Sequence, residues 1–92
     1  MAKTKDIGEL KLGDAIGVVG YDAAPLYVAR VGETHIRARV DNLPWLVTIA
    51  KKDIVWKEEQ PLEQRMQNLK NLNEWEPTLV LMRKKKKLKE VV

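Results

Sequence analysis

The clearest pattern of polar and apolar positions lies in the middle of the chain, over residues 35–41. His35, Arg37, Arg39 and Asp41 alternate there with apolar residues. A period of two predicts a β-strand, because successive side chains of a strand point to opposite faces of its sheet. We therefore expect the polar side chains on a water-facing surface and the apolar ones in a core.

Short apolar segments separated by turn residues surround this strand. Gly17 and Gly20 interrupt the first of them, and glycines within a strand indicate a bulge or a close backbone approach. A hairpin turn is expected at Gly32-Glu33, and residues 51–53 have the length of one turn of 3₁₀ helix. The expected strands are 15–21, 26–31, 35–41, 45–50 and 54–56.

The order of these segments between Leu12 and Lys57 resembles the SH3-like small barrels of the Tudor and KOW kind. The resemblance rests on Leu12-Gly13-Asp14 before the first strand, the hairpin at Gly32, and residues 51–54 before the last strand. It implies a mainly β fold with a five-stranded closed barrel. Barrels of this class bind RNA, DNA, modified peptides or other proteins, so the fold leaves the ligand open.

The apolar period changes after residue 60. Large apolar residues recur there at spacings of four, three, three and three, which predicts an amphipathic helix with Pro61 at its first position. Glu76-Pro77 ends it. The predicted organisation is a barrel with an N-terminal lead-in over residues 1–59, the helix over 60–76, and an apolar segment with a basic tail over 77–92. The apolar stripe of the helix consists of Leu62, Met66, Leu69, Leu72 and Trp75.

Positive charge is concentrated at the C-terminus. Residues 1–60 carry nine Lys/Arg and nine Asp/Glu, whereas residues 61–92 carry eight and four, which accounts for the whole net charge of +4. Such a cluster is typical of a segment that binds phosphates, and it is equally typical of a solvated terminus. The cations of this tail are Arg83, Lys84, Lys85, Lys86, Lys87 and Lys89.

The alternating strand supplies a second candidate for nucleic-acid contacts. His35, Arg37 and Arg39 are expected on one exposed face, with Arg30 on the neighbouring strand of the hairpin. Arginines in this arrangement can fork onto phosphates or stack on bases. The alternative is an ordinary hydrated strand face whose charges pair with nearby carboxylates.

Aromatic residues and the helix stripe suggest a different kind of partner. Tyr21, Tyr27, Trp45 and Trp56 either frame a ligand cage or fill the core; we expect Trp45 to be exposed and Trp56 to be core. The helix stripe either packs on its own barrel or offers a protein-docking surface. The residues assigned to a protein-interaction surface are Trp45, Leu62, Met66, Leu69, Leu72 and Trp75.

The inventory of residue types argues against catalysis. The chain has neither Cys nor Ser, and His35 is its only histidine, so the commonest nucleophiles and a second imidazole are missing. We expect no catalytic residue, no metal site and no cofactor. No apolar run of about 20 residues is present, and cysteine is absent, so we expect no membrane partner and a cytoplasmic location.

Two functions are therefore expected from the sequence. The first is a non-enzymatic module that associates with DNA or RNA through the basic tail and the basic strand face. The alternative is a protein-interaction module, such as an accessory subunit or a small inhibitor from a virus or mobile element. That module would join a larger protein assembly through the barrel surface and the apolar helix.

Overall fold

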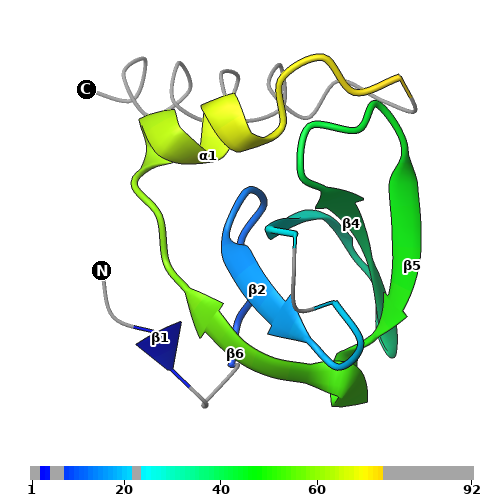
Figure 1. Ribbon diagram of the computed structural model, residues 1–92. Coiled ribbons are helices and arrows are strands. Elements are labelled where there is room, and N and C mark those ends of the chain that lie inside the picture. Colours follow the sequence, from blue (N-terminus) through cyan, green and yellow to red (C-terminus); the bar gives the residue numbers. More distant parts are fainter. Residues whose placement is uncertain (1–2, 5–7, 22–23, 74–92) are drawn as a thin grey trace.

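A computed structural model describes residues 3–4, 8–21 and 24–73 of the chain. The strands form one antiparallel sheet in the order β1-β6-β2-β3-β4-β5. Figure 1 shows this sheet curving around β2, with α1 lying across one end. The elements are β1 (Lys3–Thr4), β2 (Ala15–Val18), β3 (Leu26–Val31), β4 (His35–Val40), β5 (Leu46–Ala50), the 3₁₀ turn η1 (Lys51–Asp53), β6 (Ile54–Glu58) and α1 (Leu62–Asn68).

The five expected β segments and the 3₁₀ turn are present, although the first strand ends at Val18 instead of residue 21 and the short β1 was not expected; the expected closed barrel is wrong. Among the described residues, β5 pairs with β4 alone, and no strand pairing joins β5 to β6. Lys57 and Glu58 of β6 pair with β2 on one edge and with β1 on the other, so this end of β6 has no free edge. The η1 turn joins β5 to β6, and the two strands run in different directions (Figure 1). The result is a curved, open sheet.

Gly17 is needed because an aromatic ring lies directly against its backbone. A Cβ atom at this position would lie 2.0 Å from Nε1 of Trp56, its cross-strand partner on β6. The register of β2 and β6 also shifts between Gly17 and Val18. The predicted bulge and the predicted close approach are therefore both present at this glycine.

The main core lies on the inner, concave face of the sheet. Alternate residues of β3 and β4, such as Val28, Ile36 and Ala38, are almost completely buried there. The apolar residues of β4, Ile36 and Ala38, alternate with its polar residues and point to this face, as the sequence predicts. The buried members of this cluster are Leu10, Ile16, Val18, Leu26, Val28, Ile36, Ala38, Ile49 and Ile54.

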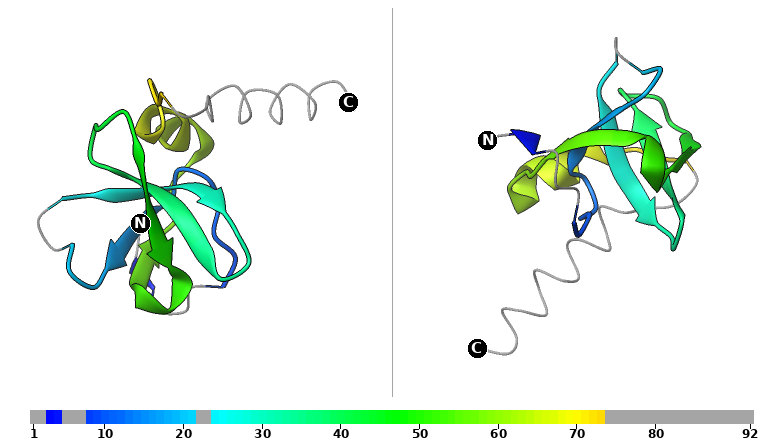
Figure 2. Two further views of the ribbon diagram at one scale, coloured as in Figure 1. Left: turned by 90° about the vertical axis from the view of Figure 1, so that its right-hand side faces the viewer. Right: turned by 90° about the horizontal axis from the view of Figure 1, so that it is seen from below.

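A second, smaller core lies on the opposite, outer face of the sheet, beneath α1. Leu69 and Leu72 are buried there against Ala29 of β3 and Leu46 of β5. Figure 2 shows α1 and the yellow segment that follows it, up to residue 73, beside the sheet. Residues 62–72 of the chain therefore cover the apolar surface at one end of the outer face.

The helix differs from its prediction in length. It ends at Asn68 instead of residue 76, and Pro61 is its N-cap residue instead of its first helical residue. Four of the five stripe residues, Leu62, Met66, Leu69 and Leu72, pack into the outer-face core, two of them buried and two partly buried. The prediction that they form a protein-docking surface is wrong for Leu69 and Leu72, because the chain itself covers them. Trp75, the fifth member of the stripe, lies outside the described residues.

Polar contacts fix the helix to the loop that precedes β2. The side-chain amide of Asn68 donates to the carbonyl of Gly13 at 2.8 Å, and both groups are buried. The buried carboxylate of Asp14 accepts from the backbone N–H of Gln60 at 3.1 Å and from that of Lys11 at 3.3 Å. Each buried polar group at this junction therefore has a partner, as stability requires.

Candidate nucleic-acid interface

The outer face of β3, β4 and β5 is divided into a covered half and an uncovered half. Cross-strand neighbours under α1 are Tyr27, Arg39 and Leu46, all of them buried or partly buried. The next outer-face row toward the hairpin contains Arg30 and Arg37, which are exposed and half-buried respectively. Because α1 is only seven residues long, it covers one end of the sheet, and no other described element lies over the end that carries Arg30 and Arg37.

Arg39 does not lie on an exposed face as predicted, and this is a correction. Its side chain is only 4% exposed, and its guanidinium donates to four backbone carbonyls. Nε donates to Leu43 O at 2.9 Å and Nη2 to Asn42 O at 3.0 Å; Nη1 donates to Asn68 O at 3.3 Å and also to Lys70 O. The alternation of β4 is real, but the segment after α1 covers this end of its polar face. Arg39 therefore ties the β4–β5 connection to the C-terminal end of α1.

Burial also changes the acid–base behaviour of this corner. It lowers the pKa of Arg39, an effect that the negative charge of Asp41 partly opposes. It raises the pKa of Tyr27, and Asp41 raises that pKa further, while Arg39 opposes the change. A guanidinium begins from so high a pKa that Arg39 keeps its charge at neutral pH.

Arg30 and Arg37 are direct cross-strand neighbours on the uncovered half of the outer face. A bulge between Val28 and Arg30 shifts the register of β3 by one residue, and this shift brings Arg30 opposite Arg37. Nη2 of Arg37 donates to Leu46 O at 3.4 Å, which directs the side chain along the face toward β5. The two arginines therefore lie opposite each other on neighbouring strands.

His35 is exposed at the hairpin end of the same strand face. A hydrogen bond of 2.8 Å joins its Nδ1 atom to Oγ1 of Thr34. The polar positions of β4 thus change from exposed at His35 to half-buried at Arg37 and buried at Arg39. Distance from α1, rather than strand period, decides how much of each side chain meets water.

Two cations that the sequence analysis did not select lie beside Arg30. Lys11, in the loop before β2, and Arg65, on α1, line a pocket of about 450 Å³ together with Arg30 and Glu9. Arg65 Nε donates to Leu12 O at 2.6 Å, which holds this side chain against the loop. Gly13, with a positive φ of 89°, permits the contact, because a Cβ atom there would lie 2.5 Å from Cβ of Arg65. A contact between a helix and a distant loop produces no periodic pattern in the sequence. The glycine at position 13 is the only local feature that could have indicated this one.

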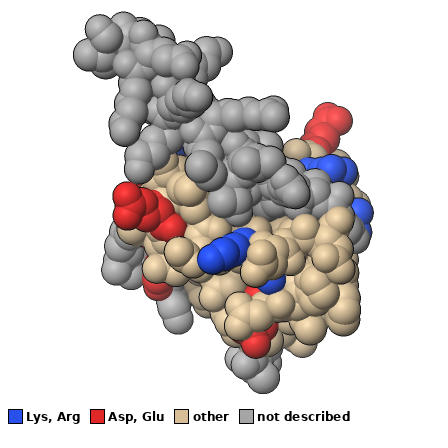
Figure 3. Space-filling model, turned by 90° about the horizontal axis from the view of Figure 1, so that it is seen from above, with Lys and Arg blue, Asp and Glu red and all other residues tan. Residues whose placement is uncertain are grey.

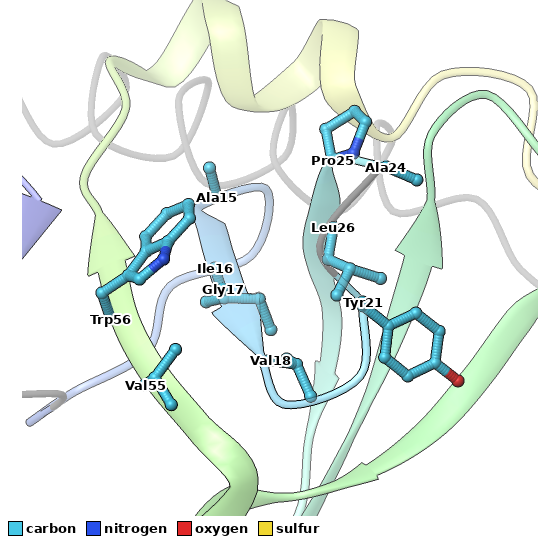
Figure 4. A pocket seen from close by; sticks show the side chains of 10 residues that line it. All are labelled: Ala15, Ile16, Gly17, Val18, Tyr21, Ala24, Pro25, Leu26, Val55 and Trp56. Atoms are coloured by element: carbon cyan, nitrogen blue, oxygen red, sulfur yellow. The ribbon is translucent and has the colours of Figure 1, made fainter.

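The four aromatic residues considered for a cage do not come together as one. Tyr21 and Trp56 line a pocket of about 350 Å³, where Figure 4 shows the Tyr21 ring directed away from Trp56. Tyr27 packs against the outer-face core instead. Trp45 is 51% exposed, as predicted. Trp56 is not core as predicted but half-buried, because it lies over the backbone of Gly17 on the strand surface.

The remaining predicted cations, Arg83, Lys84, Lys85, Lys86, Lys87 and Lys89, lie outside the described residues. In the view from above α1, the described Lys and Arg side chains lie apart from one another, with acidic side chains between and beside them (Figure 3). The described cations that are visible in this view therefore do not form one continuous patch. No described helix has both the length and the apolar character needed to cross a membrane.

Comparisons with protein-family models, with curated proteins and with solved structures found no match to this chain.

Proposed function

We propose that this protein associates with nucleic acid through four cations on and beside the uncovered half of the outer face. These outer-face cations are Lys11, Arg30, Arg37 and Arg65. We also propose that the curved sheet is an open variant of the SH3-like kind, whose rigid strands hold the cations in place. The single observation that carries the proposal is the direct pairing of Arg30 with Arg37 across β3 and β4.

Placing two like charges opposite each other costs stability in a sheet. An anion bound between or beside them offsets that cost, and arginine is the residue best suited to phosphate oxygens. Three of these cations, Lys11, Arg30 and Arg65, line one pocket, and Glu9 is the acidic residue that lines it with them. Four cations are therefore proposed to contact phosphates here, although residues 1–60 as a whole are neutral.

The salt dependence of binding measures how many cations take part. Each neutralised phosphate contributes about −0.9 to the slope of log K against log salt for duplex DNA and about −0.7 for a single strand. The outer-face cations alone would give a slope of about −3 to −4 on duplex DNA. The tail, with six cations, would add about −4 to −5 if it also neutralises phosphates.

The test is a titration of a generic duplex and a generic single strand, followed by fluorescence anisotropy at several salt concentrations. The test variant is Arg30→Gln with Arg37→Gln. The matched control is Lys52→Gln with Lys70→Gln, which removes the same charge from exposed residues away from the Arg30–Arg37 pair. We expect the test variant to reduce the slope by about 2 units and the control to change it little.

Two results would overturn this proposal. One is the absence of any salt-sensitive binding by the full chain. The other is an equal loss of affinity in the test variant and in the control, which would mean that net charge alone governs binding. A third variant, in which Lys84–Lys87 are changed to Gln, measures separately how much the tail contributes to the salt dependence of binding.

A protein-interaction function remains a second candidate because of two exposed apolar side chains. Trp45 is 51% and Leu43 is 38% exposed in the connection between β4 and β5. Tryptophan is the residue most enriched at the energetic centres of protein interfaces. Sedimentation of the full chain over a range of concentrations tests whether the protein self-associates. Self-association that Trp45→Ser abolishes would support the protein-interaction function. A monomer at every concentration would exclude a second copy of this chain as the partner.

A further inference from the structure

We infer that the pocket formed by Lys11, Arg30 and Arg65 is a binding site for a phosphomonoester, and that its ligand is the 5′-terminal phosphate of a single-stranded nucleic acid. The inference rests on the proposed function and makes it more specific, because it names the chemical group and the strand end that are recognised. The pocket has a volume of about 450 Å³ and lies between the loop before β2, strand β3 and helix α1.

Arg65 is already held in the position that a phosphate needs. Its Nε atom donates to Leu12 O at 2.6 Å, which orients the planar guanidinium at the wall of the pocket. Its terminal amino groups, Nη1 and Nη2, make no hydrogen bond to any other described residue. A half-buried arginine that is fixed through Nε loses little further side-chain entropy when Nη1 and Nη2 fork onto two phosphate oxygens.

The loop that carries Lys11 is also fixed before any ligand binds. The backbone N–H of Lys11 donates to the buried carboxylate of Asp14, and its carbonyl accepts from the backbone N–H of Asp14 at 3.1 Å. These contacts hold the residue in a tight turn while its side chain stays exposed at the pocket. The ammonium group is thus tethered near Arg65 but free to reach an oxygen.

The charge of the pocket matches a phosphomonoester better than a phosphodiester. Three cationic residues and one acidic residue, Glu9, line it, so the formal charges of the lining residues sum to +2. A phosphomonoester carries about −1.5 to −2 at neutral pH, whereas each internal phosphate of a nucleic acid carries one negative charge. The monoester also offers three terminal oxygens to these donors.

A strand end is the ligand that we infer because three parts of the chain border the site. Its walls come from three directions, namely residues 9–12, residues 29–31 and Arg65. An internal phosphate needs a path for the chain on two sides, while a terminal phosphate needs only one. Arg30 lines the pocket and also faces Arg37 across the strands, so the strand leaves the pocket over the Arg30–Arg37 pair.

The experiment compares two single strands of one sequence, one with a 5′-phosphate and the other with a 5′-hydroxyl, by fluorescence anisotropy on the full-length protein. We expect the 5′-phosphate to bind about tenfold more tightly, in keeping with the strength of charge-assisted bidentate contacts. Arg65→Gln and Lys11→Gln should each remove most of that ratio. Lys70→Gln, which removes an exposed cation outside the pocket, should leave the ratio unchanged.

Lys11→Gln keeps the test valid if Arg65→Gln destabilises the fold, because the Lys11 side chain is exposed and makes no hydrogen bond within the described residues. Inorganic phosphate should reduce the 5′-phosphate preference of the natural protein. It should not change the smaller ratio that remains in Lys11→Gln.

The results separate this inference from the proposed function. Equal, salt-sensitive binding of both strands would overturn the inference and leave the proposed function standing. If neither strand binds, both are wrong. A phosphoserine peptide that binds the pocket more tightly than the 5′-phosphate strand would also overturn the inference, because the ligand would then be a phosphorylated protein.

Discussion

Replacing Arg39 by methionine separates the structural from the ligand-binding arginines of β4. Arg39 and Arg37 lie two residues apart on the same outer face, and they differ in burial: Arg39 is 4% exposed and Arg37 is half-buried. Methionine has a similar length and no donor. Arg39→Met therefore removes the hydrogen bonds of the guanidinium while keeping much of the packing of its aliphatic stem.

The expected cost follows from the carbonyls that lose their donor. Four backbone carbonyls accept from Arg39, of which Asn68 O lies in a buried contact and the other three in partly buried ones. A buried polar group left without a partner costs about 1–3 kcal/mol, whereas a partly buried carbonyl can bond to water at a much smaller cost. Relief of the guanidinium's desolvation offsets part of the loss. We therefore expect a free energy of unfolding lower by about 2–4 kcal/mol.

The assay is urea-induced unfolding followed by tryptophan fluorescence, with the midpoint and slope fitted for each variant. A loss of about 3 kcal/mol corresponds to a fall of about 12–24 °C in Tm for a domain of this size. Arg37→Met is the matched control and should cost less than Arg39→Met, because the Arg37 side chain is only partly buried. If Arg39→Met costs no more than Arg37→Met, Arg39 does not anchor the segment after α1 and our reasoning about it fails.

Three further predictions concern the packing and the titration of the sheet. Gly17→Ala should destabilise the fold by about 1–3 kcal/mol and change the fluorescence of Trp56, because the new methyl group displaces the indole. Additive effects of Gly17→Ala and Trp56→Val in a double-mutant cycle would contradict the contact between the two residues. Leu69→Ala should cost about 2–5 kcal/mol in urea unfolding, and Leu43→Ala, at a 38% exposed position, less than about 1 kcal/mol; similar costs would mean that Leu69 is not core. Burial raises the pKa of Tyr27, so the folded state keeps a proton that the unfolded state releases at alkaline pH. The free energy of unfolding should therefore fall as pH rises above 10.0. This fall should be smaller in Tyr27→Phe, and an equal fall would remove Tyr27 as its cause.

Local patterns determined most of the β-structure. The alternation of His35, Arg37 and Arg39 with apolar residues predicted β4. Of the two glycines expected to mark a bulge or a close approach, Gly17 lies against Trp56, whereas the space beside Gly20 is open. Residues 51–53 form the predicted 3₁₀ turn. These features depend on neighbours along the chain and on cross-strand contacts with a fixed period, which a sequence displays directly.

The tertiary structure decided which polar residues meet water. Arg37 and Arg39 have the same periodic position on β4, yet only Arg39 lies beneath the segment after α1. The helix stripe was equally ambiguous, because an amphipathic helix shows that one face is buried but not against what. The structure shows that the helix stripe packs on the chain's own sheet, because Leu69 is buried against Ala29 of β3.

The pocket of Lys11, Arg30 and Arg65 could not be predicted from the sequence. Its cations are separated by 19 and 35 positions in the chain, since 30 − 11 = 19 and 65 − 30 = 35, and no period relates them. They meet because the loop before β2 passes beside β3, where the backbone N–H of Gly13 donates to Val28 O, and because α1 packs over that loop. Residue type and local period thus determined the strands, while long-range packing alone determined which charges stand together.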